Sequence, residues 1–195
     1  MRSSSILALV IGIFGGTFDP PHVGHLGVAT AAVEQLGLER LLLVPAGEPW
    51  QKSDISVTPA SHRLAMAKLA AAEDERFVVD DREIQRVGPS YTIDTVREIG
   101  ERCVLVLGTD AAAGIPTWQG GPELLSLVDL AVVERPGVSQ EDVEETLGRA
   151  VTLLSMPAVE LSATALREHI AAGWSPRFLV PEAVADYITT NGLYR

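Results

Sequence analysis

Two histidines that follow a glycine-rich turn are the residues whose types and spacing best suit chemistry. They lie in residues 15–25, which read GGTFDPPHVGH. Gly15 and Gly16 let the backbone approach a phosphate closely. His22 and His25 are three residues apart, so they share one face of a helix's first turn, at its positive end. This arrangement predicts a pair of imidazole donors aimed at a bound anion.

A metal site is the alternative for this histidine pair, because pairs of histidines also bind zinc. Asp19 is the only further ligand type near them in the sequence. A zinc site needs three or four protein ligands. We therefore expect no metal ion held by the protein's own side chains.

A second candidate phosphate site lies near the end of the sequence, where residues 161–167 read LSATALR. Ser162 or Thr164 can cap the helix that follows and leave its N–H groups for a phosphate. Arg167, one turn further on, can reach the same anion with its planar guanidinium group. Taken alone, the segment also fits an ordinary capped helix with a surface arginine.

Alternating strands and helices must position these residues. Continuous apolar runs predict buried strands, and amphipathic stretches predict helices. Their alternation predicts an α/β fold with a doubly wound parallel sheet, as one domain over residues 1–195 with a helical part from about 160 to 195. Ser90 or Thr92 is expected to cap one of the helices. The expected strands are 6–14, 40–45, 77–84, 103–107, 130–133 and 151–154, and the expected helices are 24–37, 60–73, 92–101, 139–149, 163–172 and 181–190.

The ends of two predicted strands are the expected ligand site. Ligands of such sheets bind at the carboxyl ends of the strands, near the point where the strand order reverses. The glycine turn follows the first strand, and Gly108-Thr109-Asp110 follows the fourth. An acid at the position of Asp110 commonly takes ribose hydroxyls, although an Asp in a loop is more often a turn residue. Residues 46–59 are the most loop-like stretch and are expected to form a flap.

Composition limits the partners of this chain. Its 15 basic and 26 acidic residues give a net charge of −11, which disfavours binding to nucleic acid. The single cysteine, Cys103, is expected in the core, which is consistent with a cytoplasmic protein. The apolar run 6–14 is too short to span a bilayer and precedes no cleavage site, so a buried strand is favoured over a signal peptide. His62 and His169, on predicted helices, are expected at the surface.

The segment GGTFDPPHVGH resembles the signature of the HxGH nucleotidylyltransferase superfamily, and its GGxFDPxHxGH form is similar to that of the nicotinate-nucleotide adenylyltransferases. Residues 91–95 (YTIDT) are similar to the family's YTxDT segment. Gly108-Thr109-Asp110 with Trp118 downstream resembles its GxD…W segment, and residues 161–167 resemble its ISSTxxR motif. The closing LVPEAVADYI is similar to the family's final helix, so the resemblance covers nearly the whole chain.

The resemblance implies a Rossmann-like enzyme that joins the AMP part of ATP to nicotinate mononucleotide. Trp118 would stack on the nicotinate ring, and Thr92 would hold the same substrate, partly through its backbone. The chemistry also calls for Mg²⁺ carried with the ATP phosphates. ATP and nicotinate mononucleotide are then the partners, and a homo-oligomer is compatible with this prediction. The implied site residues are His22, His25 and Arg167 for catalysis; Gly15, Gly16, Thr17, Phe18, Gly108, Asp110, Ser162 and Thr164 for ATP; and Thr92, Trp118 and Lys52 for the mononucleotide.

Two motifs depart from the family pattern. Where the family usually has PPHK, this chain has Pro49-Trp50-Gln51-Lys52, and the second serine of ISSTxxR is Ala163. Two alternatives stay open: a transferase of the same superfamily acting on nicotinamide mononucleotide or pantetheine phosphate, and a nucleotide-binding sensor without turnover. The Trp118 and YTIDT landmarks weigh against pantetheine phosphate, and the intact His22, His25 and Arg167 weigh against a sensor.

Overall fold

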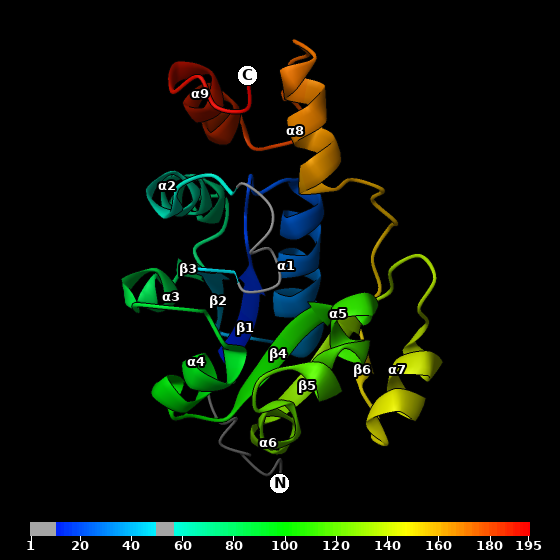
Figure 1. Cartoon of the computed structure of the whole chain (residues 1–195). Helices are drawn as coiled ribbons and strands as arrows, with labels where there is room; N and C mark the ends of the chain where they lie inside the picture. Colours follow the sequence, from blue (N-terminus) through cyan, green and yellow to red (C-terminus); the bar gives the residue numbers. More distant parts are fainter. Residues whose placement is uncertain (1–10, 50–56) are drawn as a thin grey trace, which may run out of the picture.

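A six-stranded parallel sheet forms the centre of the computed structural model, which describes residues 11–49 and 57–195 (Figure 1). The strand order is β3-β2-β1-β4-β5-β6, so it reverses between β1 and β4. This order confirms the predicted doubly wound α/β fold. The strands are β1 (Ile11–Gly16), β2 (Arg40–Pro45), β3 (Phe77–Val79), β4 (Cys103–Gly108), β5 (Val128–Val133) and β6 (Thr152–Leu153).

Helices cover both faces of the sheet, and the last two stand beside α2 at one end of the molecule (Figure 1). The predicted stop of the first helix is confirmed, because Gly37 ends it in the left-handed conformation at φ 62°. The described α-helices are α1 (Val23–Leu36), α2 (Ala60–Ala71), α3 (Arg82–Gln85), α4 (Thr92–Ile99), α5 (Thr109–Ala113), α6 (Gly121–Leu127), α7 (Gln140–Leu147), α8 (Ala163–Ala171) and α9 (Glu182–Thr190), with a 3₁₀-helix η2 (Ile115–Thr117).

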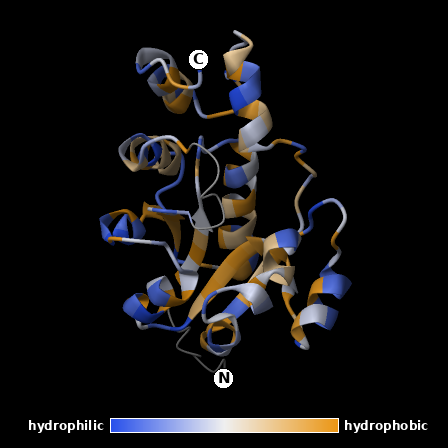
Figure 2. Ribbon diagram, in the orientation of Figure 1, coloured by the Kyte–Doolittle hydropathy of each residue, from blue (hydrophilic) through white to orange (hydrophobic). Residues whose placement is uncertain are grey.

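The sheet is buried on both faces, as the continuous apolar runs predict. Because side chains alternate along a strand, Ile11 and Ile13 of β1 pack with α4 to α7, whereas Phe14 packs with α1. Cys103 is fully buried in the first of these clusters, as expected. Apolar colouring is concentrated in the strands (Figure 2). None of the described helices is long and apolar enough to cross a bilayer.

A third apolar cluster, here called the C-terminal cluster, joins α8 and α9 to α2. It places α8 close to the turn that follows β1, because α2 packs directly on β2 and β3. The helical segment expected from about residue 160 is thereby tied to the sheet. The buried members of the cluster are Met66, Ala70, Leu166, Ile170, Val180, Val184, Ala185 and Ile188.

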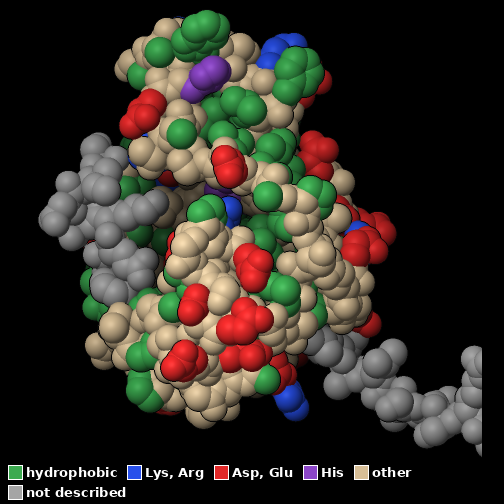
Figure 3. All heavy atoms as spheres, turned by 90° about the vertical axis from the view of Figure 1, so that its right-hand side faces the viewer, with side chains coloured by type: hydrophobic (Ala, Val, Ile, Leu, Met, Phe, Trp, Pro, Cys, Tyr) green, Lys and Arg blue, Asp and Glu red, His purple; other side chains and the backbone are tan. Residues whose placement is uncertain are grey.

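Acidic side chains are spread over the face shown in Figure 3. They accord with the net charge of −11. One contributor is α7, whose first turn holds Glu141 and Asp142, with Asp142 accepting hydrogen bonds from the backbone N–H and hydroxyl of Ser139. Such a surface repels nucleic-acid phosphates.

The predicted strand 77–84 is wrong beyond Val79. The carboxylate of Asp80 accepts hydrogen bonds from the backbone N–H and the guanidinium of Arg82, which turns the chain into the short helix α3. The predicted cap of α4 is also wrong. Tyr91 occupies the cap position, and the Ser90 hydroxyl instead accepts a hydrogen bond from the N–H of Gly47 at 2.9 Å.

Other expectations need smaller corrections. The segment between β4 and β5 holds α5, η2 and α6, which the sequence did not predict. His62 and His169 are half-buried and not free at the surface: the His62 ring lies 2.9 Å from the Tyr187 hydroxyl, and the His169 ring stacks on Trp174. Residues 6–10 of the expected first strand lie outside the described residues.

Candidate active site

Phe18 contributes a buried side chain to the turn that follows β1. Its side chain is only 2% exposed, packs edge-on against Phe14 at a centroid distance of 5.9 Å, and contacts the His25 ring at 5.1 Å. Its backbone has φ 49°, in the left-handed region. Phe18 therefore shapes the turn, and only its backbone is available to ATP.

His22 and His25 lie against each other at the start of α1, with ring centroids 3.8 Å apart. The backbone N–H of His22 donates to Nδ1 of His25 at 3.2 Å. His22 is 3% exposed, and its Nδ1 has no partner among the described residues. Burial, helped by the cation of Arg135, lowers the pKa of His22 from 6.5 to about 4. His22 is therefore neutral at pH 7, with a buried nitrogen that lacks a hydrogen bond.

Gly24, between the two histidines, makes room for the His22 ring. A Cβ atom at this position would lie 3.0 Å from both Cε1 and Nδ1 of His22. That distance is tighter than ordinary van der Waals contact, so a larger residue would push the imidazole away. The glycine of HVGH thus leaves room for the His22 ring, which a Cβ atom would displace by a few tenths of an ångström.

Arg167 reaches this turn from the far end of the chain. Its Nη1 donates to the backbone carbonyl of Asp19 at 2.9 Å, across 148 residues of sequence. Its Nη2 lies 3.3 Å from the Thr164 hydroxyl on the same helix. The structure therefore brings the second candidate phosphate site to the first.

The predicted cap of α8 is confirmed at Ser162. Its hydroxyl accepts a hydrogen bond from the N–H of Ala165 at 3.1 Å, and Thr164 lies within the first turn. Both hydroxyl groups belong to exposed residues. The start of α8 therefore faces solvent beside the turn of β1, where a ligand can approach its N–H groups.

A large cavity of about 680 Å³ lies beside the start of α1, where Gly24 separates the two histidines in the sequence. Gly24 lines it from α1, Arg135 lines it from the end of β5, and Ser162 lines it from the cap of α8. Arg135 is a site residue that the sequence analysis missed. Its position just after a predicted strand, at the carboxyl end of the sheet, was the available signal.

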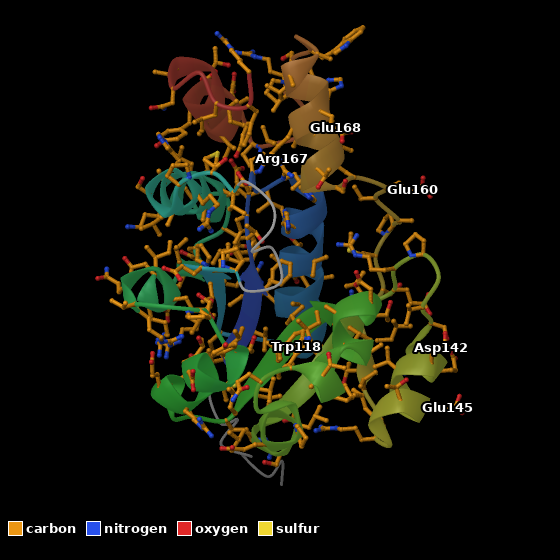
Figure 4. All side chains as sticks on the ribbon, viewed as in Figure 1. Trp118, Asp142, Glu145, Glu160, Arg167 and Glu168 are labelled. Atoms are coloured by element: carbon orange, nitrogen blue, oxygen red, sulfur yellow. The ribbon has the colours of Figure 1, made fainter. Side chains whose placement is uncertain are left out.

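A smaller cavity of about 180 Å³ adjoins the turn that follows β1. Gly15, Gly16 and Thr17 line it together with Thr92 and Trp118, two of the three residues expected for the mononucleotide. Figure 4 shows Trp118 in the lower part of the molecule and Arg167 on α8 in the upper part. The turn after β1 lines this cavity and the start of α1 lines the larger one, so both cavities adjoin one continuous segment.

Glu83 is a buried acid of the smaller cavity that the sequence analysis did not single out. It is 8% exposed, and its Oε1 accepts a hydrogen bond from the Thr95 hydroxyl at 2.6 Å. Burial raises the pKa of the Glu83 carboxyl above its ordinary value, although the bonds from Thr95 and Ser90 oppose the shift. The sequence analysis placed Glu83 in a predicted strand, 77–84, whereas it lies in helix α3. The strand pattern therefore could not show that its side chain lines this cavity.

Comparison with known proteins shows the family of this chain. The cytidylyltransferase-like family matches residues 13–169. The chain is 44% identical over 194 residues to a protein of Albidiferax ferrireducens named probable nicotinate-nucleotide adenylyltransferase, covering 95% of this chain and 98% of that one. A protein of the same name from Corynebacterium kroppenstedtii is 41% identical over 190 residues, covering 94% and 90%.

The chain belongs to the nicotinate-nucleotide adenylyltransferase family. Its fold agrees with that assignment. The solved structure of Plasmodium falciparum nicotinic acid mononucleotide adenylyltransferase complexed with NaAD superposes with a TM-score of 0.79, at 19% identity over 96% of this chain and 98% of that one. The same enzyme complexed with APC gives a TM-score of 0.76.

Within this family assignment, Gly108 and Asp110 take the positions expected of them at the end of β4. Asp110 is exposed at the start of α5. A Cβ atom at Gly108 would lie 2.5 Å from Oδ1 of Asp110 and 3.0 Å from Cγ of Arg135. Gly108 thus leaves the space that both side chains occupy. Lys52, with Trp50 and Gln51, lies outside the described residues.

Arg63 is a second residue that sequence reasoning missed. Its side chain is 1% exposed and donates hydrogen bonds to four backbone carbonyls, those of Thr17, Ala46, Gly47 and Thr58, at 2.6 to 3.0 Å. Burial lowers its pKa from the ordinary arginine value, while the Asp19 carboxylate raises it. One guanidinium group therefore joins the glycine turn to both ends of the predicted flap.

Proposed function

We propose that this chain transfers the adenylyl group of ATP to nicotinate mononucleotide, giving deamido-NAD and pyrophosphate in NAD synthesis. The observation that carries the proposal is that one continuous segment, residues 15–25, lines two separate cavities. Residues of the segment 15–25 line both cavities, with Arg135 and Ser162 around one and Trp118 around the other. A turn and the helix that directly follows it can hold two phosphorylated ligands in line.

The reaction needs positioned phosphates more than proton transfer. A phosphate oxygen of the mononucleotide attacks the α-phosphorus of ATP, the bond to the β-phosphate oxygen breaks, and pyrophosphate leaves. The nucleophile is already an anion, so no general base and no covalent enzyme intermediate are required. Catalysis then consists of alignment and of neutralising charge on the phosphates.

Each group of residues has a role in this alignment. His22 and His25 hold the α- and β-phosphates, and Arg167 with the start of α8 at Ser162 and Thr164 binds the leaving β- and γ-phosphates. Gly15, Gly16, Thr17 and Phe18 supply backbone contacts near the reacting phosphate. Asp110, beside Gly108, takes ribose hydroxyls. Thr92, Trp118 and Lys52 hold the mononucleotide, with the indole stacked on its ring.

Mg²⁺ is part of the proposal as an ion carried by the ATP phosphates. Within residues 11–49 and 57–195, no three or more His, Cys, Asp or Glu side chains are grouped to hold a metal. Phosphate oxygens and water, which Mg²⁺ prefers, would therefore supply most of its ligands. When bound, the ion offsets phosphate charge that the few cations of this acidic chain cannot balance. A cytoplasmic location is also proposed, since ATP is the substrate and Cys103 is a buried free thiol.

The test is pyrophosphate release from Mg·ATP with nicotinate mononucleotide, nicotinamide mononucleotide or pantetheine phosphate, and with no acceptor as the control. We expect nicotinate mononucleotide to give the highest kcat/KM. The nicotinamide compound belongs in the panel because the Glu83 carboxyl lines the ring cavity and, when ionised, would repel a nicotinate carboxylate. Preference for another acceptor would overturn the substrate assignment, and no release with any acceptor would indicate a sensor.

A further inference from the structure

The penultimate residue, Tyr194, is held against the body of the protein. Its ring packs on the C-terminal cluster, and the N–H of Leu193 donates to the carbonyl of Ile188 at 3.0 Å. The backbone of Tyr194 has φ 65°, a left-handed conformation that non-glycine residues adopt only when their surroundings require it. The contacts of the side chain are therefore what fixes this end of the chain.

The Tyr194 hydroxyl donates a hydrogen bond to Oδ1 of Asp19 at 2.7 Å, across 175 residues of sequence. Asp19 is 3% exposed and lies within the GGTFDPPHVGH turn. Its Oδ2 accepts from the backbone N–H of Thr58 at 3.1 Å, at one end of the predicted flap. Its backbone carbonyl is the acceptor for Arg167 at 2.9 Å. Asp19 thus joins the C-terminus, the flap and the arginine of α8 at one point.

We infer that Tyr194 is a positioning residue for adenylyl transfer, acting through Asp19 on the phosphate-binding turn and on Arg167. This inference rests on the proposed function. The hydroxyl touches no proposed substrate. It also lies 3.9 Å from Sδ of Met66, and its effect is assigned to the charged partner, the Asp19 carboxylate. Because Asp19 stands three residues before His22, a rotation of its side chain or a shift of its carbonyl moves the groups that would align ATP.

The direction of the Tyr194 hydrogen bond is stable over the pH range of the reaction. Burial and the neighbouring Asp19 carboxylate raise the pKa of the Tyr194 hydroxyl well above its ordinary value, so it remains a donor. Without this donor, Oδ1 of Asp19 would lose its one described partner. A buried carboxylate oxygen that loses its partner must turn or admit water. Either change alters the point at which Arg167 and Thr58 are held.

The test compares two tyrosine hydroxyls of the same C-terminal part. Tyr194→Phe removes the contact to Asp19. Tyr187→Phe is the matched control, because its hydroxyl also lies at hydrogen-bond distance from a partner, 2.9 Å from Nδ1 of His62, which belongs to α2 and not to the turn. Initial rates with ATP and the mononucleotide varied separately, and melting temperatures, are measured for both variants and the unaltered protein.

Tyr194→Phe is expected to lower kcat/KM for ATP by about tenfold to a hundredfold, the loss typical of a displaced catalytic group. The KM of this variant for the mononucleotide is expected to stay within about twofold of the unaltered protein. Every kinetic constant of Tyr187→Phe is expected to stay within the same range. A Tyr194→Phe enzyme with normal kcat/KM for ATP would overturn the inference. So would equal losses in both variants that follow their melting temperatures, since these would show a structural role alone.

A double-mutant cycle with Asp19→Asn tests the route from the other end of the contact. If Tyr194 acts through Asp19, the double variant is about as impaired as Asp19→Asn, whereas additive losses would contradict the route. Calorimetric ATP binding gives the same comparison without turnover. Should the unaltered protein bind ATP but release no pyrophosphate, the proposed function fails, and the binding losses still decide whether Tyr194 positions the ATP site. Should Tyr194→Phe fail to fold, weakened ATP binding in Asp19→Asn supports the route, and unchanged binding overturns it.

Discussion

The backbone N–H of His22 donates to Nδ1 of His25 at 3.2 Å, so the two histidine rings of the HVGH segment are held in different ways. An acceptor at Nδ1 means that a neutral His25 ring carries its proton on Nε2. His22, in contrast, is buried and keeps an unpartnered Nδ1 among the described residues. His25 is therefore oriented by the backbone, whereas His22 is oriented by packing.

Replacing His25 with alanine should lower kcat far more than it raises KM. The imidazole is proposed to act on charge that develops in the transition state, where one lost donor costs about 10²–10³ in rate. The control is His169→Ala, which removes a ring of α8 that stacks on Trp174. This variant should retain nearly full activity. A His25→Ala enzyme within threefold of the unaltered protein would remove His25 from the mechanism.

Gly24→Ala tests the space that the glycine gives to His22. The added Cβ would lie 3.0 Å from the imidazole, so the ring must shift by a few tenths of an ångström. We expect kcat to fall by about tenfold while the melting temperature changes little, because alanine favours the helix. Thr30→Ala, at an exposed position of α1, provides the comparison. Unchanged kcat in Gly24→Ala would mean that the position of His22 is unimportant for turnover.

Arg167 should matter for ATP and for pyrophosphate but little for the mononucleotide. Arg167→Lys keeps the charge and loses the two-pronged contact, so a substantial loss should remain. Arg167→Ala should cost about 2–4 kcal/mol in kcat/KM for ATP. In the reverse reaction the KM for pyrophosphate should rise in the variant, while that of the dinucleotide stays nearly fixed.

The control for the arginine is Arg177→Ala, which removes an exposed cation paired with Glu182 and Asp186. It should leave both reverse-reaction constants unchanged. Normal pyrophosphate affinity in Arg167→Ala would show that residues 161–167 form only a capped helix. The active site would then depend on the histidine pair and the glycine turn.

Trp118→Ala should weaken binding of the mononucleotide and leave ATP nearly unaffected. Stacking beyond burial is worth roughly 0.5–1.5 kcal/mol, so the mononucleotide KM should rise by about 2–10-fold or somewhat more with the lost area. Trp174→Ala removes an indole that is 65% exposed and should change neither KM. If the KM for ATP rises instead, the indole lies on the adenine side and the two cavities hold the opposite ligands.

His22 should make the stability of the protein depend on pH between about 4 and 6.5. Its pKa is lowered to about 4 in the folded protein, so over this range the unfolded chain binds a proton that the folded one does not. The contribution of His22 to the free energy of unfolding is complete above pH 6.5. It is lost as the pH falls toward 4, by about 3 kcal/mol in all. Urea unfolding of the unaltered protein and of His22→Gln at pH 7.5, 6 and 5 measures the difference. Parallel pH profiles would contradict the lowered pKa.

The sequence alone determined the features that depend on neighbouring residues. Apolar runs predicted β1, β2 and β4, because a strand buried on both faces has no polar alternation. The spacing of His22 and His25 predicted their shared face, and Ser162 predicted the start of α8. Local patterns misjudged residues 77–84, where the carboxylate of Asp80 turns an apparent strand into a helix.

Only the tertiary structure decided which distant segments meet. The strand order brings the turn of β1 beside β4, and the C-terminal cluster brings Arg167 and Tyr194 to Asp19. The tertiary structure also decided that Arg63 joins the glycine turn to the ends of the predicted flap, and that the pKa of His22 is low. Each depends on burial and charge contributed by segments far away in the sequence, which no local spacing of residues records.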